Sequence, residues 1–204
     1  PVLVQETLST IESADSTSND TVVIVISKSG STAEIAALLM VTQQALPQAK
    51  YIAITEENSQ LHGYAISNGW ETLPVPDGVG GRFSVLSNVG LFPAFLCHIN
   101  CEELLRGARE MDQLCLKEDN NPALSLAQFL VDSYESERSI HVLMPYCSRL
   151  ANLSDWYVQL WAESLGKVDA HGNRVGPTPV AAIGATDQHS TLQLWQEGPL
   201  DKVI

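Results

Sequence analysis

A run of β-branched residues, Thr21 to Ile26 (TVVIVI), constrains the fold more than any other feature of this sequence. A continuous apolar run without polar alternation is typical of a strand buried on both faces of a parallel sheet. An amphipathic helical pattern follows at 35–46, and a second strand pattern follows at 51–55. Strands that alternate with helices predict a doubly wound parallel α/β sheet.

The same alternation continues along the rest of the chain. We expect helices at 61–67, 84–117 (two, the second opening at Cys101-Glu102-Glu103), 123–134, 149–165 and 187–196, and extended segments at 72–75, 140–144 and 179–183. The polar segment Lys117–Pro122 (KEDNNP) ends in proline and is the best candidate for a domain junction. The sequence therefore predicts two α/β domains, residues 1–117 and 118–204.

The charge balance limits the possible partners. The net charge is −13, from 11 basic and 24 acidic residues. A field of this sign repels phosphate backbones and anionic lipid, so we expect neither nucleic-acid nor membrane binding. No apolar run reaches the ~18 residues that a membrane span needs. A phosphorylated small molecule would also be repelled at long range, so any phosphate site must be built locally from a helix N-terminus or a few cations.

The four cysteines, Cys97, Cys101, Cys115 and Cys147, form no CxxC pair. A metal site at Cys97-His98 and Cys101 lacks a second ligand pair at zinc spacing. Reduced thiols in a cytoplasmic protein explain these cysteines better. We expect neither a metal nor an organic cofactor.

The turn Ser27–Thr32 (SKSGST) lies between a predicted buried strand and a predicted helix. Five of its six residues carry a hydroxyl or an ammonium group, and the free N–H groups of the first helical turn point to the same place. Together with the helix dipole, these groups suit a phosphate. The turn does not match the GxxxxGK[ST] pattern of nucleotide-binding loops. A helix cap without a ligand remains an open alternative.

A second candidate is the glycine-rich segment Asp77–Ser84 (DGVGGRFS). Its glycines allow positive φ and a close approach of the backbone to a ligand. Arg82 follows them directly and suits a developing oxyanion, while Ser84 is expected to cap the helix behind it. A tight turn with a solvated arginine is the alternative.

The predicted helix at 149–165 contains the third candidate. Gln159 and Glu163 are four residues apart and therefore share one helical face, close to Asp155 and Trp156. We expect the indole of Trp156 to desolvate Glu163 partly, which would raise the pKa of that carboxyl and make it a better base. A solvated helix edge is the alternative.

The fourth candidate, Gly184–His189 (GATDQH), lies between a predicted strand and a predicted helix. His189 falls in the first turn, where the helix dipole disfavours imidazolium, so the ring should be able to exchange a proton near neutral pH. A histidine that only packs or caps is the alternative.

These four segments, in this order, resemble the glucose-6-phosphate isomerase family in its bacterial form. The matching stretches are SKSGSTAE at 27–34, DGVGGRFSVLSNVG at 77–90, QLWAES at 159–164 with Gly166-Lys167, and GATDQHS at 184–190. Asn88 departs from the small residue expected in the second stretch. The likeness runs through nearly the whole chain. It implies two partial sugar-isomerase (SIS) domains, each an α/β/α sandwich of parallel strands.

The resemblance also implies a role for each candidate residue. Ser27, Ser29 and Thr32 would hold the phosphate of a sugar phosphate, with Lys28 assisting through its main chain or side chain. Arg82 would stabilise an enediolate. Glu163 would move a proton between C2 and C1, with Gln159 beside it. His189 would help to open the pyranose ring, supplied in this family by the partner subunit of a homodimer.

The implied reaction interconverts glucose 6-phosphate and fructose 6-phosphate without a cofactor. The chain starts at Pro1 without an initiator Met, and we expect it to be an internal piece that is inactive alone. The family's Gly-Gly-Ser loop would lie upstream, and its catalytic Lys would lie downstream. The alternatives are a SIS-type module that binds a sugar phosphate without catalysis, an isomerase that also accepts mannose 6-phosphate, and a fusion to another enzyme.

Overall fold

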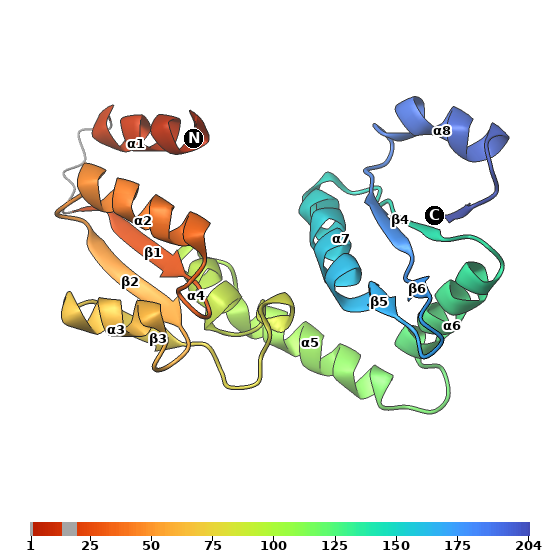
Figure 1. Ribbon diagram of the computed structural model, residues 1–204, viewed down its shortest axis with the longest axis horizontal. Helices are drawn as coiled ribbons and strands as arrows, with labels where there is room; N and C mark the ends of the chain where they lie inside the picture. Colours follow the sequence, from red (N-terminus) through yellow and green to blue (C-terminus); the bar gives the residue numbers. More distant parts are fainter. Residues whose placement is uncertain (1, 14–19) are drawn as a thin grey trace. The chain divides into compact units, whose positions relative to one another are not determined.

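The computed structural model describes residues 2–13 and 20–204 of the chain (Figure 1). It divides into two compact units, residues 1–105 and 106–204, and each is described by itself. The expected domain boundary between residues 117 and 118 stays a prediction, because compact units do not define the domains of a longer protein. Within the described ranges, no helix is long and apolar enough to cross a membrane.

The first unit follows the predicted alternation of strands and helices. Its elements are α1 (Val2–Ser13), β1 (Val22–Ile26), α2 (Ala33–Ala45), β2 (Lys50–Thr55), α3 (Gln60–Ser67), β3 (Glu71–Pro74), the 3-10 helix η2 (Gly81–Phe83), α4 (Asn88–Leu96) and α5 (Cys101–Cys115), whose later turns belong to the second unit. The expected second helix does begin at Cys101, so this prediction is confirmed.

The sheet of the first unit has three parallel strands in the order β1-β2-β3. β2 is the central strand, and its residues from Tyr51 to Thr55 are all buried. The expectation that the Thr21–Ile26 run is buried on both faces is met only in part, because Val22 is exposed and Val25 alone is buried. The reason is position: β1 has a strand neighbour on one side only in the described sheet, whereas β2 has one on each side.

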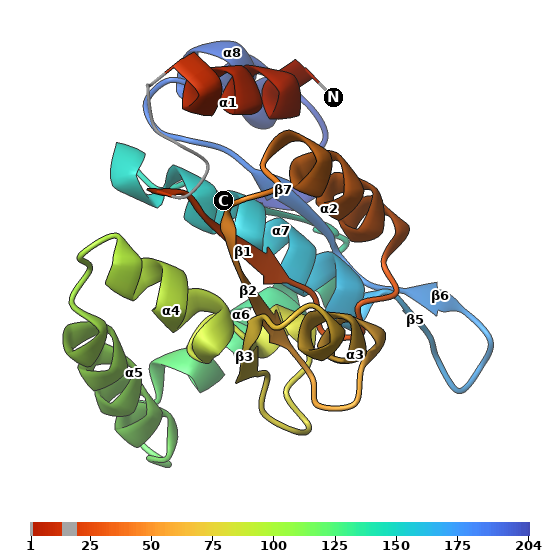
Figure 2. The same cartoon turned by 90° about the vertical axis from the view of Figure 1, so that its left-hand side faces the viewer.

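Helices α2 and α3 pack on one face of this sheet. The core cluster joins Val25 of β1 and Ala53 of β2 with Leu61 and Ala65 of α3, and Leu39 of α2 packs against it. These strand residues have odd numbers, so they point to the same face. Figure 2 shows the two helices beside the strands. Because α2 connects β1 to β2 and α3 connects β2 to β3, their packing on the sheet also positions the loops between these strands and helices.

The second unit repeats the parallel arrangement. Its elements are α6 (Pro122–Glu135), β4 (Ile140–Leu143), the 3-10 helix η3 (Ser148–Leu150), α7 (Ala151–Leu165), β5 (Lys167–Val168), β6 (Arg174–Val175), β7 (Thr178–Ala181), α8 (Gln188–Glu197) and β8 (Lys202–Val203). The main sheet has the order β7-β4-β8, and both neighbours of β4 are parallel to it. The predicted parallel α/β fold is therefore confirmed in both units.

Helix α7 runs along β7 from the carboxyl edge of the sheet to its amino edge. Near its start, the buried Ser154 donates from Oγ to the Ala182 carbonyl, just past the end of β7, over 3.3 Å. Near its end, a Cβ added at Gly176, which precedes β7, would lie 2.7 Å from the Leu165 carbonyl oxygen. Two contacts at opposite ends of β7 therefore fix the direction of the helix.

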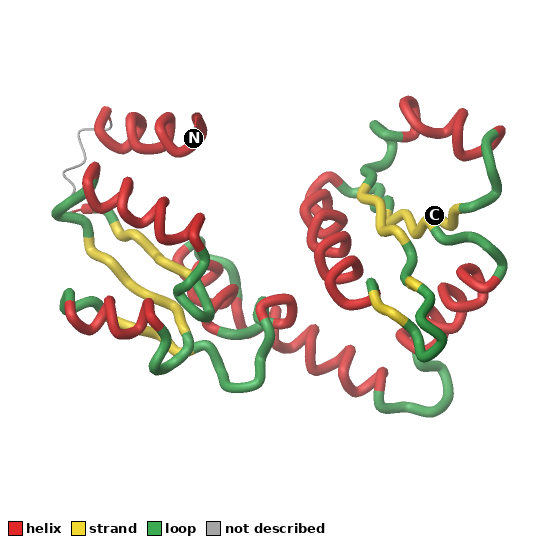
Figure 3. The backbone as a smooth tube through the Cα atoms, viewed as in Figure 1, coloured by secondary structure: helices red, strands yellow, loops and turns green. Residues whose placement is uncertain are grey.

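The helix α1 and the hairpin of β5 and β6 were not predicted from the sequence. The hairpin is a two-residue antiparallel ladder joined by a turn (Figure 3). In that turn, Asp169 Oδ1 accepts from the backbone N–H groups of His171 and Asn173, each over 2.8 Å. These bonds and that of the Asn173 side chain lower the pKa of Asp169. The hairpin follows directly on the helix that carries Glu163.

Candidate active site

Both candidate segments of the first unit lie at the carboxyl edge of its sheet. Ser27–Thr32 follows the end of β1, and Asp77–Arg82 follows the end of β3. Because β1 and β3 flank β2, these loops leave the sheet two strand spacings apart, about 10 Å. Ligands of open parallel sheets bind outside this edge. The first unit therefore brings its two candidate segments to one side.

The Ser27–Thr32 loop presents hydrogen-bonding groups around the start of α2. Ser27 is buried, and its Oγ accepts from the Gly30 N–H over 3.1 Å. The hydroxyls of Ser29 and Ser31 lie 2.8 Å apart. Thr32 is the N-cap residue of α2, but its side chain makes no capping bond, so the first-turn N–H groups are left for another acceptor. This geometry suits an anion at the helix N-terminus.

The loop is held in place by the neighbouring strand. The Lys28 carbonyl accepts from the Thr55 hydroxyl and from the Glu56 N–H, each over 3.1 Å, and Thr55 lies 2.7 Å from the Ser59 hydroxyl. The Ser29 carbonyl accepts from the Gln60 N–H over 3.3 Å. Sequence reasoning missed this positioning role, because the bond joins Thr55 to a loop 27 residues earlier and no local pattern shows that pairing.

Gly30 is the one position of the loop where no other residue fits. Its φ is +71°, and an added Cβ would come within 2.3 Å of the Leu61 backbone nitrogen. The loop therefore lies directly on the first turn of α3. A side chain here would be strained in φ and would also push the two segments apart.

The ammonium group of Lys28 forms an exposed ion pair across the loop. Its Nζ lies 3.8 Å from Glu56 Oε1, and both side chains are more than a third exposed. Such a pair is weak in water. A bound phosphate can therefore compete with Glu56 for Lys28 at little cost.

Arg82 lies in η2, behind the glycines that follow β3. The residue is half-buried, and its guanidinium carbon lies 5.4 Å from the centre of the Phe83 ring. Gly78 has a φ of +77°, as expected for the turn. The side chain is thus supported by its neighbour on the loop while remaining accessible.

The expectation that Ser84 caps the following helix is wrong. Ser84 is buried and donates to the Gly81 carbonyl over 2.7 Å, which closes η2. Ser87 caps α4 instead, because its Oγ accepts from the Val89 N–H. Asn88, which departs from the family pattern, donates from its amide to the Pro74 carbonyl over 2.7 Å. It therefore ties the start of α4 to the end of β3.

Gln159 and Glu163 lie side by side on α7, as their spacing predicts. Gln159 donates from Nε2 to Glu163 Oε1 over 3.1 Å, and both side chains are exposed. The amide therefore orients the carboxylate. Trp156 is 41% exposed, and the expected partial desolvation of Glu163 by its indole stays a prediction. The inward face of the helix carries Tyr157 and Trp161, whose rings are 5.1 Å apart.

His189 lies in the first turn of α8, as predicted, and its side chain is exposed. The loop before it is held tightly: Asp187 Oδ2 accepts from the Ile183 N–H over 2.7 Å, and Tyr146 donates to Gln188 Oε1 over 2.9 Å. A Cβ at Gly184 would lie 2.7 Å from the Tyr146 ring. The histidine thus projects from a rigid loop at the carboxyl edge of the second sheet.

Glu163 and His189 lie at opposite edges of that sheet. Glu163 comes nine residues after Ser154, which marks the carboxyl edge, and is therefore about 13 Å further along the helix axis. His189 follows the carboxyl end of β7. Figure 1 shows the end of α7 beside β5 and α8 at the other end of the unit. One copy of this unit does not bring the two groups together.

The remaining titratable side chains do not assemble into a metal centre. Across residues 2–13 and 20–204, no group of three or more His, Cys, Asp or Glu side chains is arranged to hold a metal ion. All four cysteines are free.

Comparison with known proteins identifies the family. Residues 2–203 match the phosphoglucose isomerase family. The chain belongs to this family. The match covers both units, so every candidate residue described above lies within it.

Curated relatives in the family carry the name glucose-6-phosphate isomerase. The protein from Carboxydothermus hydrogenoformans is 43% identical over 197 residues, which cover 90% of this chain and 42% of that relative. The protein from Rubrobacter xylanophilus is 44% identical over 192 residues, covering 88% and 43%. The chain thus spans under half the length of these phosphoglucose isomerase family members.

A solved structure shows the same fold. The crystal structure of a hypothetical protein from Thermus thermophilus matches with a TM-score of 0.91 at 37% identity, covering 100% of this chain and 49% of that one. The arrangement of strands and helices described here is therefore shared along the entire chain.

Proposed function

We propose that this chain is part of a glucose-6-phosphate isomerase, which interconverts glucose 6-phosphate and fructose 6-phosphate through a cis-enediolate. Family membership supports isomerase chemistry on a sugar phosphate. The observation that carries the proposal is the orientation of Glu163 by Gln159 over 3.1 Å, next to a family match that includes all four candidate segments. A cytoplasmic location and a homodimeric state belong to the same proposal.

The Ser27–Thr32 loop binds the phosphate of the sugar. Ser27, Ser29 and Thr32 supply hydroxyls, the start of α2 supplies N–H groups, and Lys28 supplies charge at the rim. Holding the anionic end fixes the open-chain sugar, and positioning of this kind contributes a large part of a rate enhancement. The bracing by Thr55 keeps these groups in place before the substrate arrives.

Arg82 faces the enediolate oxygens that gain negative charge during the reaction. Its support on Phe83 and on the glycine loop orients the guanidinium. Fixed charges that meet developing charge stabilise the transition state more than the ground state.

Glu163 removes the proton from C2 of the open-chain aldose and returns it to C1 of the enediolate. Protons also move between the two oxygens, so glucose 6-phosphate becomes fructose 6-phosphate with no net gain or loss of atoms. Gln159 keeps the carboxylate oriented. The carboxylate is exposed in the described chain, and the bound sugar or a second chain would desolvate it.

His189 opens the pyranose ring in the site of a partner subunit. Ring opening breaks the bond between C1 and O5, next to the carbon atoms on which Glu163 acts. Groups that act on neighbouring atoms must each lie within hydrogen-bond reach, about 2.6–3.2 Å. The separation of about 13 Å along α7 supports a site that combines Glu163 of one chain with His189 of another.

The proposal is tested with Glu163→Gln in the full-length protein. We expect kcat to fall by roughly 10²–10⁴-fold while the KM for fructose 6-phosphate changes little, because only the proton transfer is removed. Glu135→Gln is the matched control, since it makes the same substitution at an exposed position on another helix, α6. Near-normal turnover of Glu163→Gln would reject Glu163 as the base. A full-length protein that binds the sugar phosphate without converting it would favour the non-catalytic module.

A further inference from the structure

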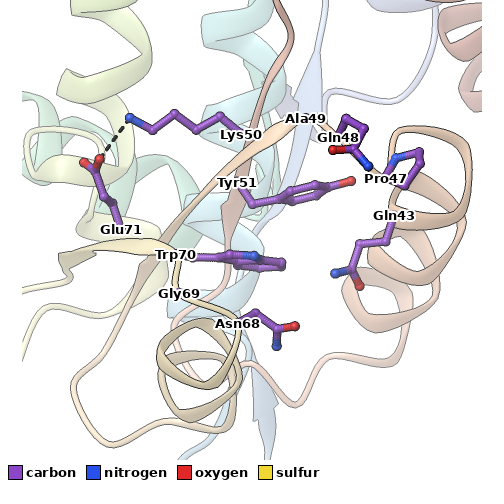
Figure 4. A pocket seen from close by; sticks show the side chains of 10 residues that line it. All are labelled: Gln43, Pro47, Gln48, Ala49, Lys50, Tyr51, Asn68, Gly69, Trp70 and Glu71. Atoms are coloured by element: carbon purple, nitrogen blue, oxygen red, sulfur yellow. Dashed lines mark ion pairs between the residues drawn. The ribbon is translucent and has the colours of Figure 1, made fainter. Parts of the chain in front are cut away.

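A cavity of the first unit lies at the amino edge of its sheet, opposite the candidate phosphate loop. It has a volume of about 510 Å³ and is formed where α2 and α3 end and β2 and β3 begin (Figure 4). This volume falls within the range of about 300–1,000 Å³ that is typical of small-molecule sites. The family chemistry described above makes no use of this edge.

The lining of the cavity combines carboxamides with aromatic rings. The side chains of Gln43, Gln48 and Asn68 surround the edges of the Tyr51 and Trp70 rings, as Figure 4 shows. The two rings are stacked with centroids 4.7 Å apart and planes at 16°. Gln43 Oε1 accepts from the Tyr64 hydroxyl over 2.9 Å and Asn68 Nδ2 donates to the Tyr64 carbonyl over 2.8 Å, so Gln43 can offer its Nε2 as a donor and Asn68 its Oδ1 as an acceptor. The aromatic rings offer apolar contact. Such a lining suits a ligand with hydroxyl groups on a carbon skeleton.

The charged side chains of the cavity form an ion pair. Lys50 Nζ and Glu71 Oε1 are 2.9 Å apart at its rim and neutralise each other. Burial raises the pKa of the Tyr51 hydroxyl, which therefore stays neutral and donates to the Leu46 carbonyl. The two charged residues of the lining therefore give it no net charge, which neither attracts nor repels a charged ligand.

Two helices also end at this edge. α2 ends at Ala45 and α3 ends at Ser67, so the negative ends of both dipoles meet the cavity. Pro47 has no N–H group, so the Gln43 carbonyl lacks the usual partner four residues on. The last carbonyls of α3 already accept from the N–H groups of Asn68, Gly69 and Trp70, so the Gln43 carbonyl at the end of α2 is the backbone acceptor for a ligand hydroxyl. The amino edge is thus the electrostatic opposite of the Ser27–Thr32 loop.

We propose that this cavity is a second binding site, specific for an uncharged polyhydroxyl molecule such as a free sugar or sugar alcohol. Hydroxyl groups bond to Gln43, Gln48 and Asn68, and the carbon skeleton lies against the edges of Tyr51 and Trp70. A phosphorylated sugar is disfavoured by the negative ends of the two helix dipoles. The site is separate from the proposed isomerase site and does not depend on it.

The test uses the full-length protein labelled with 5-fluorotryptophan and titrated with D-glucitol, followed by ¹⁹F NMR. Trp70→Phe assigns the Trp70 signal. We expect that signal to shift saturably in the millimolar range, while the signals of Trp156, Trp161 and Trp195 stay in place. Trp156 and Trp161 lie on the helix of Glu163, so a shift there and not at Trp70 would report binding at the isomerase site and would reject the proposal.

Two variants make the result specific. Gln48→Ala removes a carboxamide of the lining and should weaken D-glucitol binding about tenfold, whereas Gln44→Ala, an exposed glutamine outside the lining, should leave it unchanged. Glucose 6-phosphate at the same concentration should not shift the Trp70 signal. No saturable shift with D-glucitol, or an equal shift with the phosphorylated sugar or with a polyamine, would overturn the proposal.

Discussion

The two units share one fold but place their candidate residues differently. In the first unit, the Ser27–Thr32 loop and Arg82 both follow strand ends at the carboxyl edge of one sheet. In the second unit, His189 lies at the carboxyl edge, whereas Glu163 lies about 13 Å beyond Ser154 along α7, toward the amino edge. The first unit therefore has its candidate residues on one side of the sheet. The second unit has Glu163 and His189 on opposite sides, and one copy of the unit does not bring them together.

This difference shows what each unit contributes. A loop after a strand can present several groups at one place, and bonds from the neighbouring strand hold those groups together, as Thr55 does for Lys28. A helix carries its residues away from the strand edge at about 1.5 Å per residue. A residue near the end of such a helix, as Glu163 is on α7, therefore lies at the amino edge of the sheet, where a second chain can contact it.

Arg82→Ala should give the largest effect among the variants of the first unit. The guanidinium is supported by the Phe83 ring and meets the enediolate, so we expect kcat to fall roughly 10²–10³-fold with a smaller change in KM. Steady-state kinetics of the full-length protein measure it. Arg106→Ala, at an exposed i,i+4 ion pair on α5, is the control and should be near wild type. If only KM changed, Arg82 would act in binding and not on the enediolate.

Gly30→Ala tests whether the packing of the Ser27–Thr32 loop on α3 contributes to the stability of the first unit. The added Cβ would meet the Leu61 backbone at 2.3 Å with a φ of +71°, so we expect a loss of at least about 2 kcal/mol in the free energy of unfolding. Gly63→Ala, in the next helix, has nothing within 4 Å and should stabilise by roughly 0.5–1 kcal/mol. Urea denaturation measures both. Equal effects would show that the loop does not rest on α3.

His141 provides a smaller, pH-dependent test in the second unit. Its side chain is 2% exposed in β4, and burial lowers its pKa, with the Arg138 backbone opposing part of the shift. The unfolded chain, with a pKa of about 6.5, then binds the proton more tightly than the folded chain. The contribution of His141 to the free energy of unfolding is therefore fully present above a pH of about 6.5 and decreases as the pH falls below that value.

The measurement compares urea midpoints at about pH 7.5 and about pH 5.5 for wild type and His141→Phe. We expect the drop in stability at the lower pH to be smaller in the variant. His171→Ala, at an exposed position of the β5–β6 turn, should keep the wild-type drop. An unchanged drop in His141→Phe would assign the pH dependence to other groups.

Much of the fold could be predicted because periodicity is a local property. The β-branched run of β1, the alternation after it and the start of α5 at Cys101 follow from the residues themselves. Exposure is not local: β1 and β2 are both rich in apolar residues, but only the central β2 has a continuous buried run, from Tyr51 to Thr55. The Ser84 cap failed for the same reason, because η2 uses that hydroxyl before α4 begins.

The candidate site was predictable as a set of segments but not as an arrangement. The spacing of Gln159 and Glu163 predicted their contact, which the structure confirms. The spacing could not show that Trp156 stays in solvent while Trp161 turns inward, since that depends on which face of α7 packs on β7. Nor could it place Glu163 and His189 at opposite edges, because that requires the direction of the helix relative to the sheet.

The most direct test of the account mixes two inactive variants of the full-length protein, Glu163→Gln and His189→Ala, under conditions that allow subunits to exchange. If each site takes Glu163 from one chain and His189 from another, half of the sites in a mixed dimer are intact. Random exchange should then restore roughly a quarter of the wild-type turnover of cyclic glucose 6-phosphate. No recovery, in mixed dimers verified by native mass spectrometry, would contradict the account.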